Sequence, residues 1–439
     1  MPRVLALDVG TSSLRARVYD EQGRPLEGIE ERTAYEPNAD GELDAGRLAE
    51  IAREAEARVR AAAGAVDAPA ISCFWHSMLP VDARGRPLTR VLTWLDTRPA
   101  PDAEELARCL DGRAVHARTG CPLHPSFWPA KLRWLRRTEP ESFADTARFV
   151  SFADFLHGEA VTSLSMASGT GLLDVHRCAW DEELLAELEL TPERLPEISD
   201  GPLLLGDGAA SNLGAGCTTA DRAALMIGTS GAYRVLFEAD DAEARSGLFL
   251  YRLDHRRFVA GGALSDGGNL WAWLERTLCL PDAPDVSKRA PGAGGIVFVP
   301  ALGGERSLGW NPRARGAIAG LHLAAEPIDL FQAALEGVAC RFADVADRLP
   351  EVREIVATGH ALLANRGWVQ IVADVLERPI TLSAVDEASA RGAALYALER
   401  FGAEPEPAPL AGVVEPRPER AEAYRELRER QRALYEAVT

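Results

Sequence analysis

An aspartate between two glycines is the clearest candidate for acid–base chemistry in this sequence. Asp207 lies in the run Gly206-Asp207-Gly208, ahead of an alanine-rich stretch with helical character. A carboxylate flanked by residues without bulk can approach a substrate hydroxyl closely and take its proton while that oxygen attacks a phosphorus atom. Taken alone, the run is also an acceptable helix N-cap. Its place at the start of the second half of the chain favours the catalytic interpretation.

A second aspartate, Asp8, ends a short apolar run and precedes a turn of small residues that begins at Gly10. A carboxylate in this position can hold a magnesium ion near phosphates that are bound by the N–H groups of the turn. The same carboxylate could instead cap its own turn. Both interpretations stay open from this motif alone.

The chain contains this kind of turn twice, about half of its 439 residues apart. Residues 9–13 (VGTSS) and 227–231 (IGTSG) each follow an apolar strand-like run and lead into another one. One such turn is a weak signal, but two in the same context predict two related α/β domains that face each other across a cleft. We place the boundary between residues 200 and 201, in the proline-rich segment 191–202, which shows no helical or strand period.

Two further segments have side chains suited to holding a polyol. Trp94 and Asp96 lie in the run 94–98 (WLDTR), and proteins hold polyols with rings against C–H groups and charged groups on hydroxyls. A core tryptophan beside a surface ion pair explains that run equally well. His76 and Ser77 follow a predicted strand; a buried histidine with its hydrogen bonds satisfied is commoner, but the imidazole could also meet a substrate hydroxyl or carboxylate.

Glycine turns at Gly267 and Gly359 lie beside predicted strands in the second half. Each is a weak nucleotide signal and could equally be a plain loop. The sequence has no G-x-x-x-x-G-K-[ST], no G-x-G-x-x-G that opens a Rossmann unit, no H-E-x-x-H and no G-x-S-x-G. P-loop ATPases, the usual dinucleotide dehydrogenases, zincins and α/β-hydrolases therefore lack support.

The composition indicates a globular protein that acts on a small molecule. Its 66 acidic and 48 basic residues give a net charge of −18, which argues against a nucleic-acid partner. The seven cysteines are scattered without a C-x-x-C pair, as is typical of reduced thiols. Because no long apolar run and no secretion signal is present, we expect a cytoplasmic protein without a membrane partner, and we allow for a homodimer.

Strands and helices must position these residues, and the hydrophobic periodicity predicts both throughout the chain, in the α/β class. Apolar and alternating runs predict strands around each small-residue turn. Helices are predicted from Asp44 to a stop at Gly64, and over residues 327–349, 368–376, 388–401 and 421–438.

Taken together and in order along the chain, these segments resemble the FGGY family of carbohydrate kinases. The stretches that carry the resemblance are LALDVGTSSLRARVYD (5–20, first phosphate motif), LTWLDTRPA (92–100, sugar side), GDGAASNLGAG (206–216, catalytic aspartate), MIGTSGAYRVLF (226–237, second phosphate motif) and ATGHALLANRGWVQIVADVLERPI (357–380, adenosine side).

The resemblance implies two ribonuclease-H-like domains of the actin and Hsp70 type around a central cleft, with residues 1–200 on the sugar side and 201–439 on the nucleotide side. It implies ATP and Mg²⁺, and transfer of the γ-phosphoryl group to a hydroxyl that Asp207 deprotonates while Asp8 assists the metal. It assigns phosphate or nucleotide binding to Thr11, Ser12, Ser13, Gly228, Thr229, Ser230, Gly267, Gly359 and Asn365, and substrate binding to His76, Ser77, Trp94 and Asp96.

Within the family, residues 75–98 and 119–135 look more like gluconate kinases than like glycerol or xylulose kinases, so gluconate is the favoured substrate. The alternatives are a xylulose, other pentulose or polyol kinase and, from another class, a non-catalytic actin-like nucleotide switch. A switch would not need Asp207, Trp94 and Asp96. Gluconate is anionic, so local arginine or histidine residues would have to attract it to an acidic protein.

Overall fold

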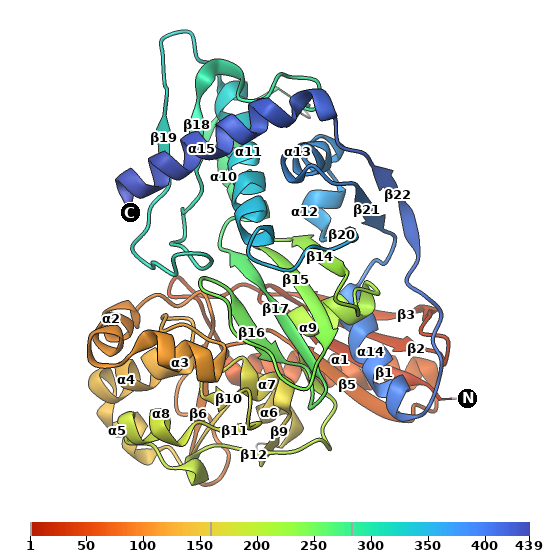
Figure 1. Cartoon of the computed structure of the whole chain (residues 1–439). Helices are drawn as coiled ribbons and strands as arrows, with labels where there is room; N and C mark the ends of the chain where they lie inside the picture. Colours follow the sequence, from red (N-terminus) through yellow and green to blue (C-terminus); the bar gives the residue numbers. More distant parts are fainter. Residues whose placement is uncertain (1, 159, 282–283) are drawn as a thin grey trace.

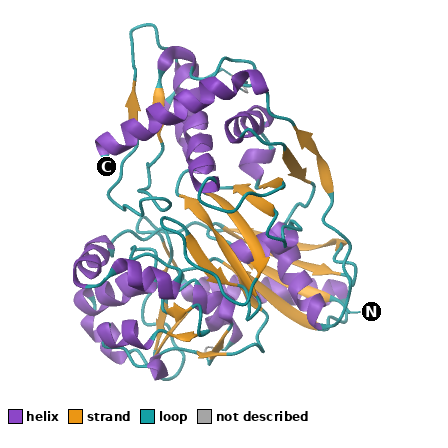
Figure 2. Cartoon of the chain, in the orientation of Figure 1, coloured by secondary structure: helices purple, strands orange, loops and turns teal. Residues whose placement is uncertain are grey.

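The protein is described by a computed structural model over residues 2–158, 160–281 and 284–439. Two large mixed sheets with helices packed on them form most of the molecule, and a lobe of short helices is attached to the first sheet (Figures 1 and 2). Among the described residues, no helix has both the length and the apolar character needed to cross a membrane.

The first sheet has three antiparallel strands followed by two parallel ones. β1 pairs antiparallel with β2 and parallel with β5, so it lies at the centre. Across the sheet the order is β13 (Leu204–Gly206), β5 (Ala68–Cys73), β1 (Val4–Val9), β2 (Ser13–Tyr19) and β3 (Pro25–Ala34). The predicted strand, turn and strand around the first small-residue turn are therefore confirmed.

The second sheet repeats this arrangement and adds one strand at each edge. Its strands are, in order, β16 (Phe249–Arg252), β17 (Arg257–Leu264), β15 (Gly231–Glu238), β14 (Arg222–Ile227), β20 (Glu354–Thr358), β21 (Ile380–Ser383) and β22 (Leu410–Val414). β14 pairs antiparallel with β15 and parallel with β20, as β1 does with β2 and β5. The two turns are thus equivalent, and the predicted pair of ribonuclease-H-like domains is confirmed.

Alternate side chains of β1 enter two different cores. Leu5, Leu7 and Val9 pack with α1 (Ala45–Ala63), whereas Val4 and Ala6 pack with α14 (Ala388–Arg400). This follows from the two-residue period of a strand. A strand that is buried on both faces is strongly apolar, which explains why the run VLALDV predicted a strand from the sequence alone.

The predicted helices are confirmed, with small differences at their ends. The Asp44 side chain accepts a hydrogen bond from Arg47 N at 2.9 Å where α1 begins, and Gly64 ends it with φ 77°. The other α-helices outside the attached lobe are α9 (Asp207–Gly214), α10 (Gly268–Thr277), α11 (Pro327–Ala346), α12 (His360–Leu363), α13 (Arg366–Leu376) and α15 (Ala421–Val438). α11 is three residues shorter than predicted, because the chain leaves the helix at Asp347.

The attached lobe lies between β5 and β13 in the chain (Figure 1). Its helices are α2 (Ala100–Cys109), α3 (Gly112–Thr119), α4 (Trp128–Thr138), α5 (Pro140–Asp145), α6 (Phe152–His157), α7 (Leu164–Ser168) and α8 (Glu182–Glu187). Outside the two large sheets, the remaining short strands form two-stranded pairs: β4 (Glu42–Leu43) with β7 (Val91–Leu92), β6 (Leu79–Val81) with β8 (Arg148–Val150), β9 (Val161–Thr162) with β12 (Glu197–Ile198), β10 (Leu173–Asp174) with β11 (Ala179–Trp180), and β18 (Val297–Val299) with β19 (Ala317–Ala319).

The chain crosses between its two halves in both directions. β13 belongs to the first sheet although it follows the predicted boundary at residues 200/201, and α14 returns from the second half to pack on β1 and β5. The segment 191–202 contains β12, a strand of two residues and therefore too short to give the period that we looked for.

α9 and α14 cross at two glycines, which bring the helix backbones into contact. A Cβ atom on Gly214 would lie 1.8 Å from the Ala388 carbonyl oxygen, and one on Gly392 would lie 1.8 Å from the Ala210 carbonyl oxygen. Real side chains cannot occupy these places, so the crossing needs glycine on both helices. This reciprocal contact fixes one half of the protein against the other.

We predict that Gly392→Ala lowers the free energy of unfolding by about 1–3 kcal/mol, because the added methyl group forces α9 and α14 apart. Gly46→Ala is the matched control. Gly46 lies in the first turn of α1, where the nearest atom to a new Cβ is 3.5 Å away, so alanine should leave stability equal or slightly higher. Urea unfolding of both variants measures this, and equal stabilities would contradict the role of the crossing.

Candidate functional site

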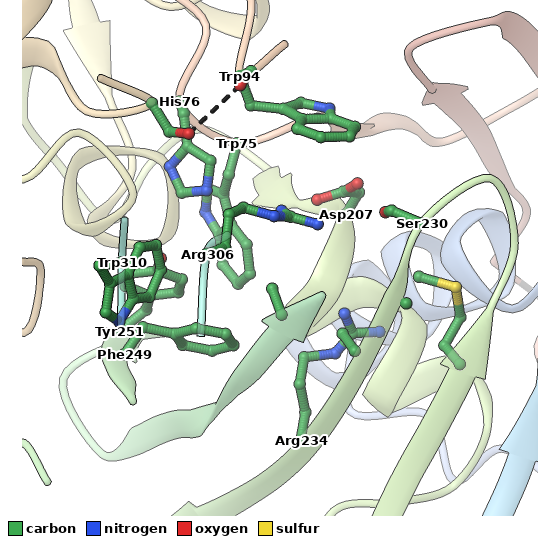
Figure 3. Close-up of a pocket in the computed structure, with 15 residues that line it drawn as sticks. Trp75, His76, Trp94, Asp207, Ser230, Arg234, Phe249, Tyr251, Arg306 and Trp310 are labelled. Atoms are coloured by element: carbon green, nitrogen blue, oxygen red, sulfur yellow. Dashed lines mark hydrogen bonds between the residues drawn. The ribbon is translucent and has the colours of Figure 1, made fainter. Parts of the chain in front are cut away.

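A cavity of about 70 Å³ lies between the first and second sheets where β13 passes into α9 (Figure 3). Both halves of the chain contribute to its wall, and they bring together four predicted residues, His76, Trp94, Asp207 and Ser230. The other lining residues are Trp75, Ser126, Met226, Gly231, Ala232, Arg234, Phe249, Tyr251, Ala263, Arg306 and Trp310.

Asp207 is the first residue of α9 and points into this cavity (Figure 3). Gly206 is the N-cap, so the structure does not use Asp207 as the cap. Burial raises the pKa of Asp207 above its ordinary value, the nearby Arg234 guanidinium opposes that rise, and Asp8 adds to it. The site thus holds a desolvated carboxylate whose proton affinity is increased.

The glycines around Asp207 have a packing function that the sequence did not reveal. A Cβ atom at Gly206 would lie 1.8 Å from the Trp75 ring, and one at Gly208 would lie 2.6 Å from it. The Trp75 indole donates from Nε1 to the Ser165 carbonyl at 2.8 Å, which fixes the ring against both glycines. We expected these small residues to let a substrate approach the Asp207 carboxylate. In the structure, their small size makes room for the Trp75 ring.

Asp8 is buried at the centre of the first sheet, and its partners lie on the neighbouring strands. Ser72 Oγ donates to one carboxylate oxygen at 2.8 Å, and Arg15 Nη1 lies 3.1 Å from the other. These partners replace the turn-capping role that the sequence left open. Burial raises the pKa of Asp8, and Arg15 and Ser72 oppose the rise.

The carboxylate oxygens of Asp8 and Asp207 are ligands of the kind that suit a magnesium ion that also binds phosphate. Mg²⁺ commonly takes one or two carboxylates and completes its octahedron with water and phosphate oxygens. Over the described ranges, no group of three or more His, Cys, Asp or Glu residues could hold a metal by itself. Asp8 and Asp207 supply two carboxylates, which is the number that such a Mg²⁺ site commonly takes from the protein.

In each small-residue turn the glycine N–H is bonded within the turn, to the residue three positions on in the first and two positions on in the second. Gly10 N donates to Ser13 O at 3.0 Å, and Gly228 N donates to Ser230 O at 2.9 Å. In the first turn, Thr11 Oγ1 also accepts from Trp94 Nε1 at 2.9 Å. Of the other predicted phosphate residues, Ser12 and Thr229 are exposed and Ser13 is buried.

Two predicted glycines pack directly on the second turn. A Cβ atom at Gly267 would lie 2.7 Å from the Ser230 backbone, and one at Gly359 would lie 2.4 Å from the Ile227 carbonyl oxygen. Gly359 also has φ 88°, which favours glycine. Asn365 follows α12 and is the N-cap of α13, where its side chain accepts from Trp368 N at 2.9 Å.

His76 presents a neutral imidazole to the cavity. Its Nδ1 lies 2.6 Å from the Gly169 carbonyl, which can only accept, so Nδ1 carries the proton and Nε2 is left as an acceptor. Burial lowers the pKa of His76 to about 3. Ser77 lines no part of this cavity: it is fully buried, and its Oγ accepts from Phe152 N at 3.1 Å at the start of α6.

A second cavity of about 360 Å³ adjoins the first and shares Trp94, Ser126 and Arg306 with it. Asp96 lines this second cavity and is fully buried. Its carboxylate accepts from the backbone N of Arg98 at 3.0 Å and from Arg98 Nε at 2.9 Å. The ion pair suggested by the run 94–98 is therefore present, and it lies at the wall of a cavity.

Lys131 is a positioning residue that sequence analysis did not single out. It lies on α4, is fully buried, and donates from Nζ to the carbonyls of His76 and Leu92. It thereby connects the segments that carry His76 and Trp94. Only one other lysine, Lys288, occurs in the chain, and a lysine within the apolar run PAKLRWL was the available signal.

The fold and the site define a class of protein: two ribonuclease-H-like domains, equivalent turns on the two sheets, and an aspartate on a cavity that both halves line. The N-terminal-domain model of the FGGY family of carbohydrate kinases matches residues 3–210, and the C-terminal-domain model matches residues 223–399. The chain belongs to this family and is a carbohydrate kinase.

Similar proteins cover nearly the whole chain. Gluconokinase from Bacillus subtilis (strain 168) is 27% identical, covering 91% of this chain and 88% of that protein. Glycerol kinase from Alkalilimnicola ehrlichii is 30% identical, covering 92% and 91%. The crystal structure of gluconate kinase from Lactobacillus acidophilus superposes with a TM-score of 0.89 at 25% identity, covering 99% of this chain and 98% of that one.

We predict that Lys131 makes stability rise with pH. Burial lowers the pKa of Lys131 to about 7, below that of a lysine in the unfolded chain. Above pH 7 the folded state therefore binds fewer protons than the unfolded chain. The free-energy cost of burying the Lys131 charge, which is present below pH 7, declines as pH rises through 7. Between pH 6 and 8, the wild type should gain about 1.4 kcal/mol relative to Lys131→Met. Urea unfolding of both proteins at the two pH values tests this; parallel changes would show that Lys131 does not titrate.

Proposed function

We propose that this kinase transfers the γ-phosphoryl group of ATP to a hydroxyl of a small sugar acid, with gluconate as the first candidate. The observation that carries the proposal is the desolvated Asp207 carboxylate on a cavity that also contains Ser230 of the second phosphate turn. The gluconate-phosphorylating enzymes of Bacillus subtilis and Lactobacillus acidophilus, both similar along nearly the whole chain, support this choice of substrate.

In the proposed reaction, Asp207 removes the proton from the substrate hydroxyl as its oxygen attacks the γ-phosphorus. The new O–P bond forms while the bond from phosphorus to the β,γ-bridging oxygen breaks, and ADP leaves. The N–H groups of residues 11–13 and 229–230 would bind phosphate oxygens from opposite walls, while those of Gly10 and Gly228 hold the turns closed. Asp8 would help to hold Mg²⁺, which when bound would neutralise charge on the phosphate oxygens.

The sugar would lie between His76 and Trp94, on the side of the cleft formed by residues 1–200. His76 accepts a hydrogen bond through Nε2 because its proton is on Nδ1. Trp94 offers a ring face for C–H groups, and Thr11 Oγ1 holds that ring in place. The nucleotide would lie on the side of residues 201–439, near Gly267, Gly359 and Asn365.

A polyol or a pentulose is the second candidate substrate, since the glycerol kinase of Alkalilimnicola ehrlichii is 30% identical and the xylulose kinase of Staphylococcus xylosus is 26% identical. Location in the cytoplasm and a homodimer remain predictions. A non-catalytic nucleotide switch is disfavoured, because it gives no reason for a carboxylate with increased proton affinity on the cavity wall.

We predict that Asp207→Asn abolishes sugar-dependent ADP release, with at least a hundredfold loss of kcat, because the amide cannot accept the proton. Binding of ATP should change little, since the phosphate turns remain. A coupled assay with gluconate and a panel of neutral sugars measures turnover, and calorimetry measures ATP binding. Near-normal turnover would refute the assignment. Hydrolysis of ATP by the wild type that no sugar or sugar acid stimulates would refute sugar phosphorylation itself.

We also predict that activity is lost at acidic pH as Asp207 becomes protonated. Burial raises the pKa of Asp207, so kcat/KM should decline at a pH above the ordinary aspartate value of 3.8. Arg234 opposes that rise, so Arg234→Gln should move the decline to higher pH, whereas Arg234→Lys should keep it closer to the wild type. Profiles of kcat/KM against pH test this, and identical profiles for the three proteins would contradict it.

A further inference from the structure

The two neighbouring cavities offer an elongated space with Asp207 on one side of it. Asp207 lines the first cavity only, whereas Trp94, Ser126 and Arg306 line both. A ligand that begins at Asp207 and extends into the larger cavity must therefore pass Arg306. This arrangement suits an acyclic molecule whose two ends are recognised by different groups.

Arg306 has a charge that the protein leaves largely unmatched. Its guanidinium stacks over the Trp94 ring at 4.4 Å, and its Nη2 donates to the Leu264 carbonyl at 2.8 Å. Its Nε is buried without a hydrogen-bond partner, and none of the ion pairs among the described residues includes Arg306. Asp207 and, more weakly, Asp266 favour the charged form of Arg306, but neither makes an ion pair with it among the described residues.

The carboxylates at the second cavity already have basic partners. Asp96 is paired with Arg98, and Glu305 with Arg341. Arg234, the other buried arginine of the first cavity, donates from Nε to Asn212 and faces the Asp207 charge.

The histidines at the cavities add no charge, and a further arginine does. Burial lowers the pKa of His124, at the second cavity, to about 3, so it is neutral, as His76 is. Arg315 also lines the second cavity. The space beside Arg306 is therefore locally positive, although the chain carries a net charge of −18. Such a space favours an anionic group.

We propose that Arg306 binds the carboxylate of the substrate and thereby makes the kinase selective for sugar acids over neutral sugars. The proposal rests on the function proposed above. A sugar acid would place its reacting hydroxyl at Asp207 and its carboxylate against Arg306, which lines both cavities and whose guanidinium can donate charge-assisted hydrogen bonds to a carboxylate.

The loop that carries Arg306 is held firmly from behind. Glu305 is buried, pairs with Arg341 of α11, and accepts from Tyr435 Oη of α15 at 2.6 Å. Glu305 N also donates to Asn311 O at 2.9 Å, which closes the loop. Because these contacts fix the backbone next to Arg306, the guanidinium is placed before a substrate arrives, which reduces the entropy lost on binding.

The test compares gluconate with gluconamide, a neutral analogue of nearly the same shape, as substrates of the full-length protein. The wild type should prefer gluconate in kcat/KM by about ten- to a hundredfold, the usual effect of a hydrogen bond to a charged group. Arg306→Gln should raise KM for gluconate by a similar factor, change kcat less, and bring the two substrates to near-equal kcat/KM. Arg306→Lys should retain part of the preference.

Arg256→Gln is the matched control, because it removes the same charge from an exposed arginine whose one ion pair, among the residues that the structure describes, is with Glu238. Its preference for gluconate should equal that of the wild type. Circular dichroism checks that each variant folds. If the Arg306→Gln variant does not fold, the test of the proposal uses the Arg306→Lys variant. An unchanged preference in a folded Arg306 variant, or an equal loss for both substrates, overturns the proposal.

The outcomes separate this proposal from the function on which it rests. If the wild type phosphorylates neutral sugars but no sugar acid, phosphoryl transfer stands and the role of Arg306 is overturned. If no sugar or sugar acid stimulates ADP release, the proposed function itself fails. A gluconate preference that disappears only in the Arg306 variants supports both.

Discussion

The backbone contact between α9 and α14 is the constraint on which the site depends. α9 leads from the last strand of the first sheet into the second half, and α14 returns from the second half to the first sheet. Gly214 and Gly392 let the two helices touch, and Arg391 of α14 donates from Nη1 to the Gly214 carbonyl at 2.8 Å. Since Asp207 begins α9, the same contact determines where its carboxylate lies.

The crossing also connects the two acidic residues of the site. Ser389, in the first turn of α14, donates from Oγ to the Asp207 carbonyl at 3.3 Å. Glu387, the N-cap of α14, lies 2.8 Å from Arg15, which in turn contacts Asp8. One helix end therefore supports both carboxylates, although they belong to strands and helices far apart in the chain. A relative movement of the two halves would change both positions together.

The charges of the site are arranged largely as compensated pairs within a buried region. Arg15 faces Asp8, and Arg234 faces Asp207. Unpaired charges in such surroundings are costly, so each exception is informative about a ligand. Arg306 lines both cavities and makes no ion pair among the described residues, which favours an anionic ligand beside it. An acidic protein can in this way keep a small anion-binding space inside its cleft.

Local sequence was sufficient for what depends on near neighbours in the chain. The two strand-turn-strand units, the helix ends at Asp44 and Gly64, and the candidate residues Asp8 and Asp207 were all predictable, because backbone conformation and hydrophobic period are local properties. Only the tertiary structure decided which side chains share a cavity. Ser77 and Asn365 accept hydrogen bonds at the starts of helices. Sequence analysis did not predict that Arg306 lines the cavity or that Lys131 supports the segment that carries His76. Burial, pKa and the matching of charges arise from segments that folding brings together, and no single stretch of sequence contains them.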